Sequence, residues 1–490
     1  MSKPLLIFLV IAAYIFIWLL ISFLSSKGAD NKTFFSAGRK MPWPLVAIAM
    51  LGAPITGVTF ISVPGMVLHK GFSYLQMGFG FIVGYIIIAR LLIPLYYKHN
   101  IISVYGFLQK RFGQSSYKVG AWLFFVSKIL GISVRFLTVC AILQLLVFGP
   151  LGVPFVCSVI VSLVFVWIST YKGGVKSVIW GDILKSFCLI LSIVLCLYFT
   201  ISGMGISFNE LSDRLANHES TRIFYFDDPS DAKYFWKQFI AGIFIVVAMT
   251  GLDQDMMQRS LACKNERDCG KNLYLSSVMQ FVVMTLLLIL GTIMLAYLEN
   301  ASAMVPEKGD NLFATVAFNE GIPLIVGILF VLGLVSSTYS SVSSALTSMT
   351  TTMTIDVMEA HKRRSQESLK SRRLLVHTSI SILMAVFVLF FYYLNEEDAI
   401  STVYTLISYT DGPILGLFLF GIFTSKTVNE KWIPVVCILS PVLSWLVQRM
   451  ALTYFGYQIS FELLILNCGF TMLGMALISS PARREVTAGA

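Results

Sequence analysis

A run of hydroxyl side chains lies inside one apolar segment of the chain. Residues 336–348 read SSTYSSVSSALTS, and at helical spacing Ser337, Ser340, Ser341 and Ser344 share a face, with Ser343 beside them. Serine hydroxyls suit a hard monovalent cation, especially where a broken helix exposes carbonyl oxygens as further ligands. Small residues at this spacing are also typical of close packing between membrane helices. The serines alone leave both interpretations open.

An acidic residue, Asp182, lies within another apolar segment. A carboxylate inside a membrane helix is costly, so it usually has a partner or a function. Lys185 or Lys176 would make an ordinary ion pair near the membrane interface. A cation held beside the serine helix would instead be a functional partner, and the sequence favours neither reading.

Arg135 is a basic residue deep in an apolar stretch, residues 128–138. A guanidinium matches the geometry of a carboxylate, which makes an acidic solute attractive. The same side chain could instead pair with an acid or line a water path. Its role is therefore a hypothesis about the substrate.

Two apolar segments are interrupted by helix-breaking or polar residues. The first carries Gly52, Pro54 and Gly57, and the second, residues 248–255, reads AMTGLDQD. Proline removes a backbone donor and glycine weakens a helix. Unwound backbone in a membrane is tolerated only beside a cavity or other protein. Because the breaks lie five segments apart, they indicate an inverted five-plus-five repeat; two unrelated kinks are the alternative.

The composition places all of these residues in a membrane protein. Of 490 residues, 57% are hydrophobic and 13% are charged, whereas soluble domains have roughly 25% charged residues. Spans of about 20 apolar residues suit a bilayer. We expect an all-α protein of about 13 transmembrane helices, near residues 4–24, 43–67, 74–97, 119–147, 153–171, 177–202, 236–258, 272–298, 322–357, 374–394, 399–424, 432–450 and 459–480.

The net charge of +10 is unevenly distributed between alternate loops. About 24 of the 36 basic residues fall on one side of these spans and roughly seven on the other, so the rich side is cytoplasmic. This places the N-terminus outside and the C-terminus inside. The basic excess is thus a topology signal, and we expect no nucleic-acid partner. The five histidines lie apart in the sequence, so we expect no enzyme.

Several stretches together resemble the sodium:solute symporter family. They occur in the family's order and cover nearly the whole chain. They are residues 52–64, 103–113 (SVYGFLQKRFG), 171–182 (YKGGVKSVIWGD), 253–264 (DQDMMQRSLACK), the serine run into residues 354–356, and 412–421 (GPILGLFLFG).

The resemblance implies a leucine-transporter-type fold and sodium as the coupling ion, one or two per cycle. The family's first sodium site corresponds here to the carbonyls of Gly52, Ile55 and Ser337 and the hydroxyls of Ser340 and Ser341. Some members, the sialic acid transporters among them, have a second site. Its matching positions are Asp182, Ser340, Ser343 and Ser344.

The substrate is expected between the two breaks, at mid-membrane. The candidate contacts are Thr56, Thr59, Gln76, Gly78, Arg135 and Thr250. Thr56 and Thr59 match polar substrate-contact positions of the sialic acid transporters. The arginine that holds the carboxylate in those proteins aligns with Leu130, and their nearby glutamine aligns with Gly78. This departure leaves the identity of the solute open.

The sequence therefore predicts a sodium-coupled symporter that imports a small polar solute, a sugar or sugar acid, by alternating access. The alternatives are an amino acid, vitamin or other organic acid as substrate, or a membrane-embedded solute sensor. We expect a monomer in the inner membrane. We divide the chain into an accessory helix with a cytoplasmic loop (1–42), a first repeat (43–202), an external loop (203–235), a second repeat (236–424) and two accessory helices (425–490).

Overall fold

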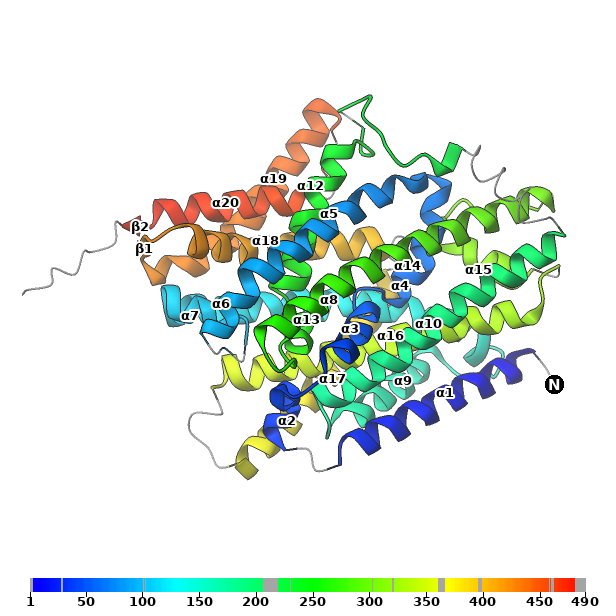
Figure 1. Cartoon of the computed structure of the whole chain (residues 1–490), viewed down its shortest axis with the longest axis horizontal. Coiled ribbons are helices and arrows are strands. Elements are labelled where there is room, and N and C mark those ends of the chain that lie inside the picture. Colours follow the sequence, from blue (N-terminus) through cyan, green and yellow to red (C-terminus); the bar gives the residue numbers. More distant parts are fainter. Residues whose placement is uncertain are drawn as a thin grey trace, which may run out of the picture.

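The structure is a computed structural model in which most of the long helices lie side by side (Figure 1). It describes residues 3–27, 30–99, 101, 103–205, 219–229, 231–301, 303–319, 321–359, 366–394, 399–457, 459 and 462–480. Most of the predicted external loop, residues 206–218, lies outside the described residues.

The first half of the chain contains ten of the helices described here. They are α1 (Lys3–Ser25), α2 (Asn31–Ser36), α3 (Trp43–Gly52), α4 (Gly57–Gly65), α5 (Tyr74–Ile87), α6 (Ile93–Lys98), α7 (Gly106–Phe112), α8 (Gln114–Leu143), α9 (Phe155–Thr170) and α10 (Val175–Met204).

In the second half, the described residues form nine α-helices and one small sheet. The helices are α12 (Phe235–Val246), α13 (Gln254–Ser260), α14 (Glu266–Asn300), α15 (Leu312–Ala317), α16 (Leu324–Thr351), α17 (Gln366–Leu394), α18 (Ala399–Phe423), α19 (Ile433–Phe455) and α20 (Leu463–Leu477). Strands β1 (Thr427–Val428) and β2 (Ser479–Ser480) pair antiparallel.

The helices have the length and composition of membrane spans. Among the described residues, nine helices pass this test, or up to eleven when each of two bent helix pairs counts as one span; α9 and α20 are shorter apolar helices. Large apolar side chains face outward, for example Phe16 on α1, Phe187 on α10 and Ile438 on α19. This pattern is expected where lipid replaces water around the protein. The chain is a multi-pass membrane protein, and the total of 13 spans and their orientation stay predictions.

Both predicted helix breaks are confirmed. Helices α3 and α4 meet at an angle of 58° across residues 53–56, and α12, extended by a π-helical turn over residues 247–251, meets α13 at 70°. A polar side chain caps the helix after each break. Thr56 accepts from the backbone N–H of Thr59, while Asp253 accepts from those of Asp255 and Met256. These caps satisfy backbone donors that lie inside the protein.

The broken helices are held in the middle of the bundle. Helix α3 packs against α10 and α14, and α10 packs in turn against α16 (Figure 1). The serine-rich part of α16 is buried throughout, and its last turns, Thr352–Val357, widen into a π-helix. The serine run therefore faces neighbouring helices along its whole length.

Candidate functional site

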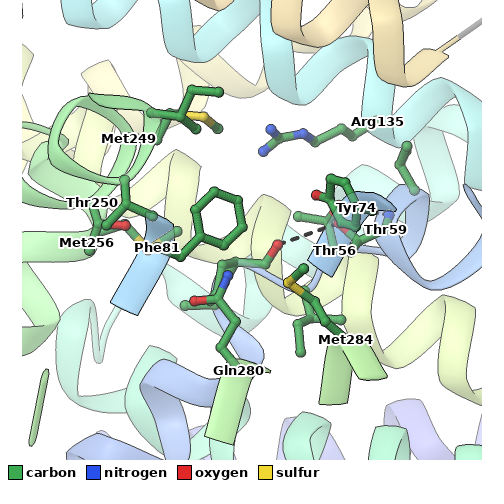
Figure 2. A pocket seen from close by; sticks show the side chains of 16 residues that line it. Thr56, Thr59, Tyr74, Phe81, Arg135, Met249, Thr250, Met256, Gln280 and Met284 are labelled. Atoms are coloured by element: carbon green, nitrogen blue, oxygen red, sulfur yellow. Dashed lines mark hydrogen bonds between the residues drawn. The ribbon is translucent and has the colours of Figure 1, made fainter. Parts of the chain in front are cut away.

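A cavity lies beside both breaks. The empty space in it, including the part open to solvent, is about 770 Å³. The lining side chains come from the α3–α4 break, α5, α8, α12 with its π-turn, α13 and α14. They are Ala53, Pro54, Ile55, Thr56, Val58, Thr59, Tyr74, Phe81, Arg135, Ile245, Val246, Met249, Thr250, Met256, Gln280 and Met284 (Figure 2).

Most of this lining is apolar, with a few polar groups directed inward. Figure 2 shows the Arg135 guanidinium pointing into the cavity from α8. Thr56 and Thr59 lie together at the first break, where their hydroxyls are 3.3 Å apart and Thr59 donates to the carbonyl of Pro54 at 3.4 Å. Such a lining provides a guanidinium and two hydroxyls for a polar solute in a mostly dry setting.

Four of the six predicted substrate contacts line the cavity. Thr56, Thr59, Arg135 and Thr250 do so. Their contact with a solute stays a prediction.

The other two residues, Gln76 and Gly78, are not among the described residues that line this cavity, and their contact with a solute stays a prediction. The amide nitrogen of Gln76 donates to the carbonyls of Ser73 and Lys233, and its oxygen accepts from the backbone N–H of Tyr225. It anchors a loop. Gly78 packs behind the cavity wall, where an added Cβ would lie 3.0 Å from the ring of Phe281.

Sequence reasoning missed one polar lining residue, Gln280 on α14. Its side-chain oxygen accepts a hydrogen bond from the Tyr85 hydroxyl at 2.9 Å. The available signal was a single amide side chain next to the apolar run of residues 281–298, because polar groups at such positions usually face the interior.

The predicted first cation site has a side chain of α10 inside it. The Ser341 hydroxyl donates to the carbonyl of Ser337 at 2.8 Å, and it accepts from the ammonium of Lys185 at 3.0 Å. Gly52 lies on the other side of that lysine, since an added Cβ would be 3.2 Å from its Cδ. Thus Gly52 and Ser341 both lie against the Lys185 side chain, Ser337 is hydrogen-bonded to Ser341, and Ile55 lies at the adjoining cavity wall.

The first break also packs directly on the serine helix. Gly57, at the start of α4, lies so close to α16 that an added Cβ would be 2.0 Å from the Thr338 hydroxyl oxygen. Only a residue without a side chain allows this approach. The expected juxtaposition of the broken helix with the serine helix is therefore present.

The residues of the predicted second site are partly brought together. Ser340 donates a hydrogen bond to Asp182, but the Ser344 hydroxyl donates to Asp255 on α13. The Ser343 hydroxyl donates to the carbonyl of Tyr339 at 2.8 Å and lies 3.5 Å from that of Ser169 on α9. Ser340 and Asp182 thus form the part of this site that is assembled.

Asp182 is paired with Arg259 of α13, a partner that neither of the two alternatives from the sequence included. Its carboxylate lies 3.0 Å from Nη1 of Arg259, and the other end of that guanidinium lies 2.8 Å from Asp255. Both carboxylates are almost completely buried. One arginine therefore joins α10 to the second break.

The chain of ion pairs continues to α8. Lys128 lies 3.0 Å from Asp255 and 2.7 Å from Asp253, the residue that caps α13. These ion pairs thus link α10, α13 and α8 through five residues in the order Asp182, Arg259, Asp255, Lys128 and Asp253. Buried charges need such partners, because each one alone would lose its hydration without compensation.

The family of the chain follows from its similarity to known proteins. Residues 34–431 match the sodium:solute symporter family. The chain belongs to the sodium:solute symporter family. Its relatives there are sodium-coupled transporters, so this member is a transporter and not an enzyme.

Individual members are similar to the chain at low identity. The sodium/sialic acid symporter NanT of Aliivibrio fischeri is 24% identical over 470 residues, which are 91% of this chain and 87% of that protein. The sodium-dependent multivitamin transporter of Oryctolagus cuniculus is 23% identical, covering 79% of this chain and 61% of the relative. The human sodium/iodide cotransporter is 21% identical, covering 85% and 64%.

A solved member of known conformation shares the fold. It is a Na+-coupled sialic acid symporter in a substrate-bound, outward-open state, with a TM-score of 0.83 at 18% identity, covering 97% of this chain and 98% of that one. At this identity the likeness establishes the architecture of the helices and leaves the solute undetermined.

Proposed function

We propose that this family member is a sodium-coupled symporter that imports a small polar organic anion, such as a sugar acid, by alternating access. The observation that carries the choice of an anion is the Arg135 guanidinium pointing into the cavity (Figure 2). Thr56 and Thr59 would serve the hydroxyl groups of such a solute, and Thr250 lies in the same lining. A planar guanidinium binds a carboxylate through two parallel hydrogen bonds.

We propose further that sodium binds between the α3–α4 break and α16, at the first cation site. This site consists of the carbonyls of Gly52, Ile55 and Ser337 and the hydroxyls of Ser340 and Ser341. Support comes from the proximity of Ser337 and Ser341 to Gly52, through the side chain between them. One positive charge moving inward gains about 2.3 kcal/mol per 100 mV, before the concentration gradient is added.

Sodium at this site would connect the broken helix to α16 and thereby shape the cavity wall formed by residues 53–56. A ligand shifts a conformational equilibrium only through its different affinities for the two states. Sodium should therefore bind the outward-open state more tightly. The ion pairs that link α10, α13 and α8 would close the other end of the path in that state and rearrange when it opens.

The repeats, the membrane orientation and the monomeric state in this proposal are those predicted from the sequence. The two breaks lie in equivalent helices of an inverted repeat, residues 43–202 and 236–424, with the N-terminus outside and the C-terminus inside. The protein works as a monomer in the inner membrane. A second sodium would use Asp182, Ser340, Ser343 and Ser344 after the pair between Asp182 and Arg259 opens.

Uptake into proteoliposomes tests this function. A panel of labelled sugar acids, neutral sugars, amino acids and vitamins is offered with an inward sodium gradient, with a potassium gradient, and with a proton gradient alone. We expect one class of carboxylate-bearing solute to accumulate only with the sodium gradient. Accumulation that follows pH alone, without sodium, would contradict the coupling.

Arg135→Gln tests the anion. It should lower uptake of the carboxylate solute at least about tenfold, because the amide keeps a hydrogen-bond donor but loses the charge. Arg90→Gln, which removes an exposed guanidinium from the segment after α5, is the matched control and should leave uptake unchanged. Equal uptake by wild type and Arg135→Gln would mean that Arg135 does not bind the solute.

A further inference from the structure

Lys185 is a buried basic residue in the position proposed for sodium. It is fully buried, and its ammonium donates to the Ser341 hydroxyl at 3.0 Å. Its methylene groups pass the first break, since Cδ and Cε lie 3.2 and 3.3 Å from the place where a Cβ on Gly52 would be. The side chain therefore crosses from α10 into the gap between Gly52 and α16.

The partners of Lys185 distinguish it from the other buried charges nearby. Arg259 and Lys128 each lie within 4 Å of two carboxylates. Among the ion pairs of the described residues, none includes Lys185, and its hydrogen bond goes to a neutral hydroxyl. A compact monovalent ammonium bound to a neutral hydroxyl oxygen uses the kind of ligand that a sodium ion would use.

We propose that the Lys185 ammonium is a tethered cation that occupies the first cation site and competes there with the coupling ion. The inference rests on the proposed function, because it assigns the competing ion as sodium. It adds an occupant from the chain itself, and it predicts that sodium enters as the lysine side chain withdraws.

The balance of buried charge supports an exchange of cations. Among the ion pairs of the described residues, the three carboxylates of Asp182, Asp253 and Asp255 are contacted by two bases, Arg259 and Lys128. Lys185 is one helical turn from Asp182 on α10, so it adds the third positive charge on the same face. A sodium ion bound next to the Lys185 ammonium would add one uncompensated positive charge to a buried region, which is unfavourable. Replacement of one cation by the other leaves the net charge of the region unchanged.

The geometry of the first break allows either the Lys185 ammonium or a sodium ion to occupy the site. Gly52 has no side chain, and a Cβ there would lie 2.8 Å from the Ser186 hydroxyl and against the lysine methylenes. The carbonyl of Ser337 is held by Ser341 whether the ammonium is present or absent, because that bond lies within α16. When sodium leaves toward the cytoplasm, the returning ammonium would fill the site and oppose rebinding.

Sodium binding to the purified full-length protein tests the proposal. The wild type, Lys185→Gln and Lys185→Met are titrated with NaCl against choline chloride at constant ionic strength, with the thermal unfolding midpoint and tryptophan fluorescence as readouts. We expect both variants to bind sodium with a half-saturating concentration at least about tenfold lower than the wild type, since a competitor has been removed. Lys176→Gln, on the same helix but outside the site, should match the wild type.

Two further measurements separate competition from a structural role. A lysine that only supports the fold would lower the unfolding midpoint without sodium when replaced, yet leave the half-saturating concentration unchanged or higher. That result in both Lys185 variants overturns the proposal. Adding Ser341→Ala to Lys185→Gln should abolish the increase in sodium affinity, because the vacated site then lacks the Ser341 hydroxyl as a ligand.

The outcomes also separate this proposal from the proposed function. Sodium binding that appears in the Lys185 variants but not in the wild type would support the tethered cation and contradict sodium coupling through the first site. Sodium-dependent uptake with unaltered affinity in both variants would retain the function and reject the tethered cation. A lack of any sodium response in all of the proteins would overturn both.

Discussion

The α3–α4 break and the α12–α13 break bend their helices by 58° and 70°, but they differ in the residues that stabilise them. The first is built from small and neutral residues, with a threonine cap at Thr56. The second carries Asp253, Asp255 and Arg259, each of which pairs with a residue of another helix. A break built from neutral residues is suited to an exchangeable ligand, whereas a break with paired charges is suited to a fixed or slowly switching connection.

The largest effect is expected from removing the central charge of the second break. Arg259→Met leaves two buried carboxylates, Asp182 and Asp255, without their shared partner. Breaking a buried pair in this way costs about 3–5 kcal/mol, so we expect a much lower unfolding midpoint in detergent and loss of transport.

The exposed pair of the external loop provides the control. Arg222→Met breaks the contact between Arg222 and Asp227, and exposed pairs contribute little to stability. An unfolding midpoint of Arg259→Met that equals those of Arg222→Met and the wild type would show that the second break does not depend on its charges.

The next effect concerns the close approach of the first break to α16. Gly57→Ala places a Cβ 2.0 Å from the Thr338 hydroxyl oxygen, so α4 must move away. Overpacking of this kind costs about 1–3 kcal/mol, and the displaced break should bind sodium more weakly. Thermal unfolding and sodium titration measure the two effects.

Gly270→Ala on α14 is the matched control, because nothing lies within 4 Å of its added Cβ. It should leave stability unchanged or raise it by up to about 1 kcal/mol, since alanine is the better helix former. Thr338→Ala should partly rescue Gly57→Ala by removing the atom in its way. If Gly57→Ala behaves like Gly270→Ala, the close approach of α4 to α16 has no energetic importance.

A smaller and more specific effect addresses the second cation site. If Asp182 binds a sodium ion during transport, Asp182→Asn should lower the number of sodium ions per solute from about two to about one. Reversal potentials measured at several sodium gradients give this ratio. An unchanged ratio would assign Asp182 to the connection with Arg259 alone.

The sequence predicted the breaks and the buried serine helix because their signals are local. Gly52, Pro54 and Gly57 weaken a helix wherever they occur in a span, and a serine run repeats at helical spacing within one segment. It did not predict the pairing of Asp182 with Arg259, 77 residues away, because partners across helices depend on packing and rotamers. For the same reason it did not predict the hydrogen bond from Lys185 to Ser341, which joins two helices distant in the sequence.

The substrate residues show the same limit. Thr56 and Thr59 were placed correctly in the cavity wall because the break itself carries them. Gln76 and Gly78 were assigned from their span, but the rotation of α5 turns Gln76 toward the loop at Tyr225 and Gly78 toward Phe281. Local sequence does not encode the rotation of a helix relative to its neighbours when apolar residues surround it on every side.

The sodium dependence of solute uptake in Ser341→Ala tests most directly whether the coupling ion binds at the first break. Ser341 supplies a proposed sodium ligand, while Ser348, two turns further along α16, donates to the carbonyl of Ala345 and serves as the control in Ser348→Ala. We predict that Ser341→Ala raises the half-saturating sodium concentration about tenfold, equivalent to roughly 1.4 kcal/mol, while Ser348→Ala matches the wild type. Equal sodium dependence in all three proteins would contradict the assignment of the coupling ion to the first break.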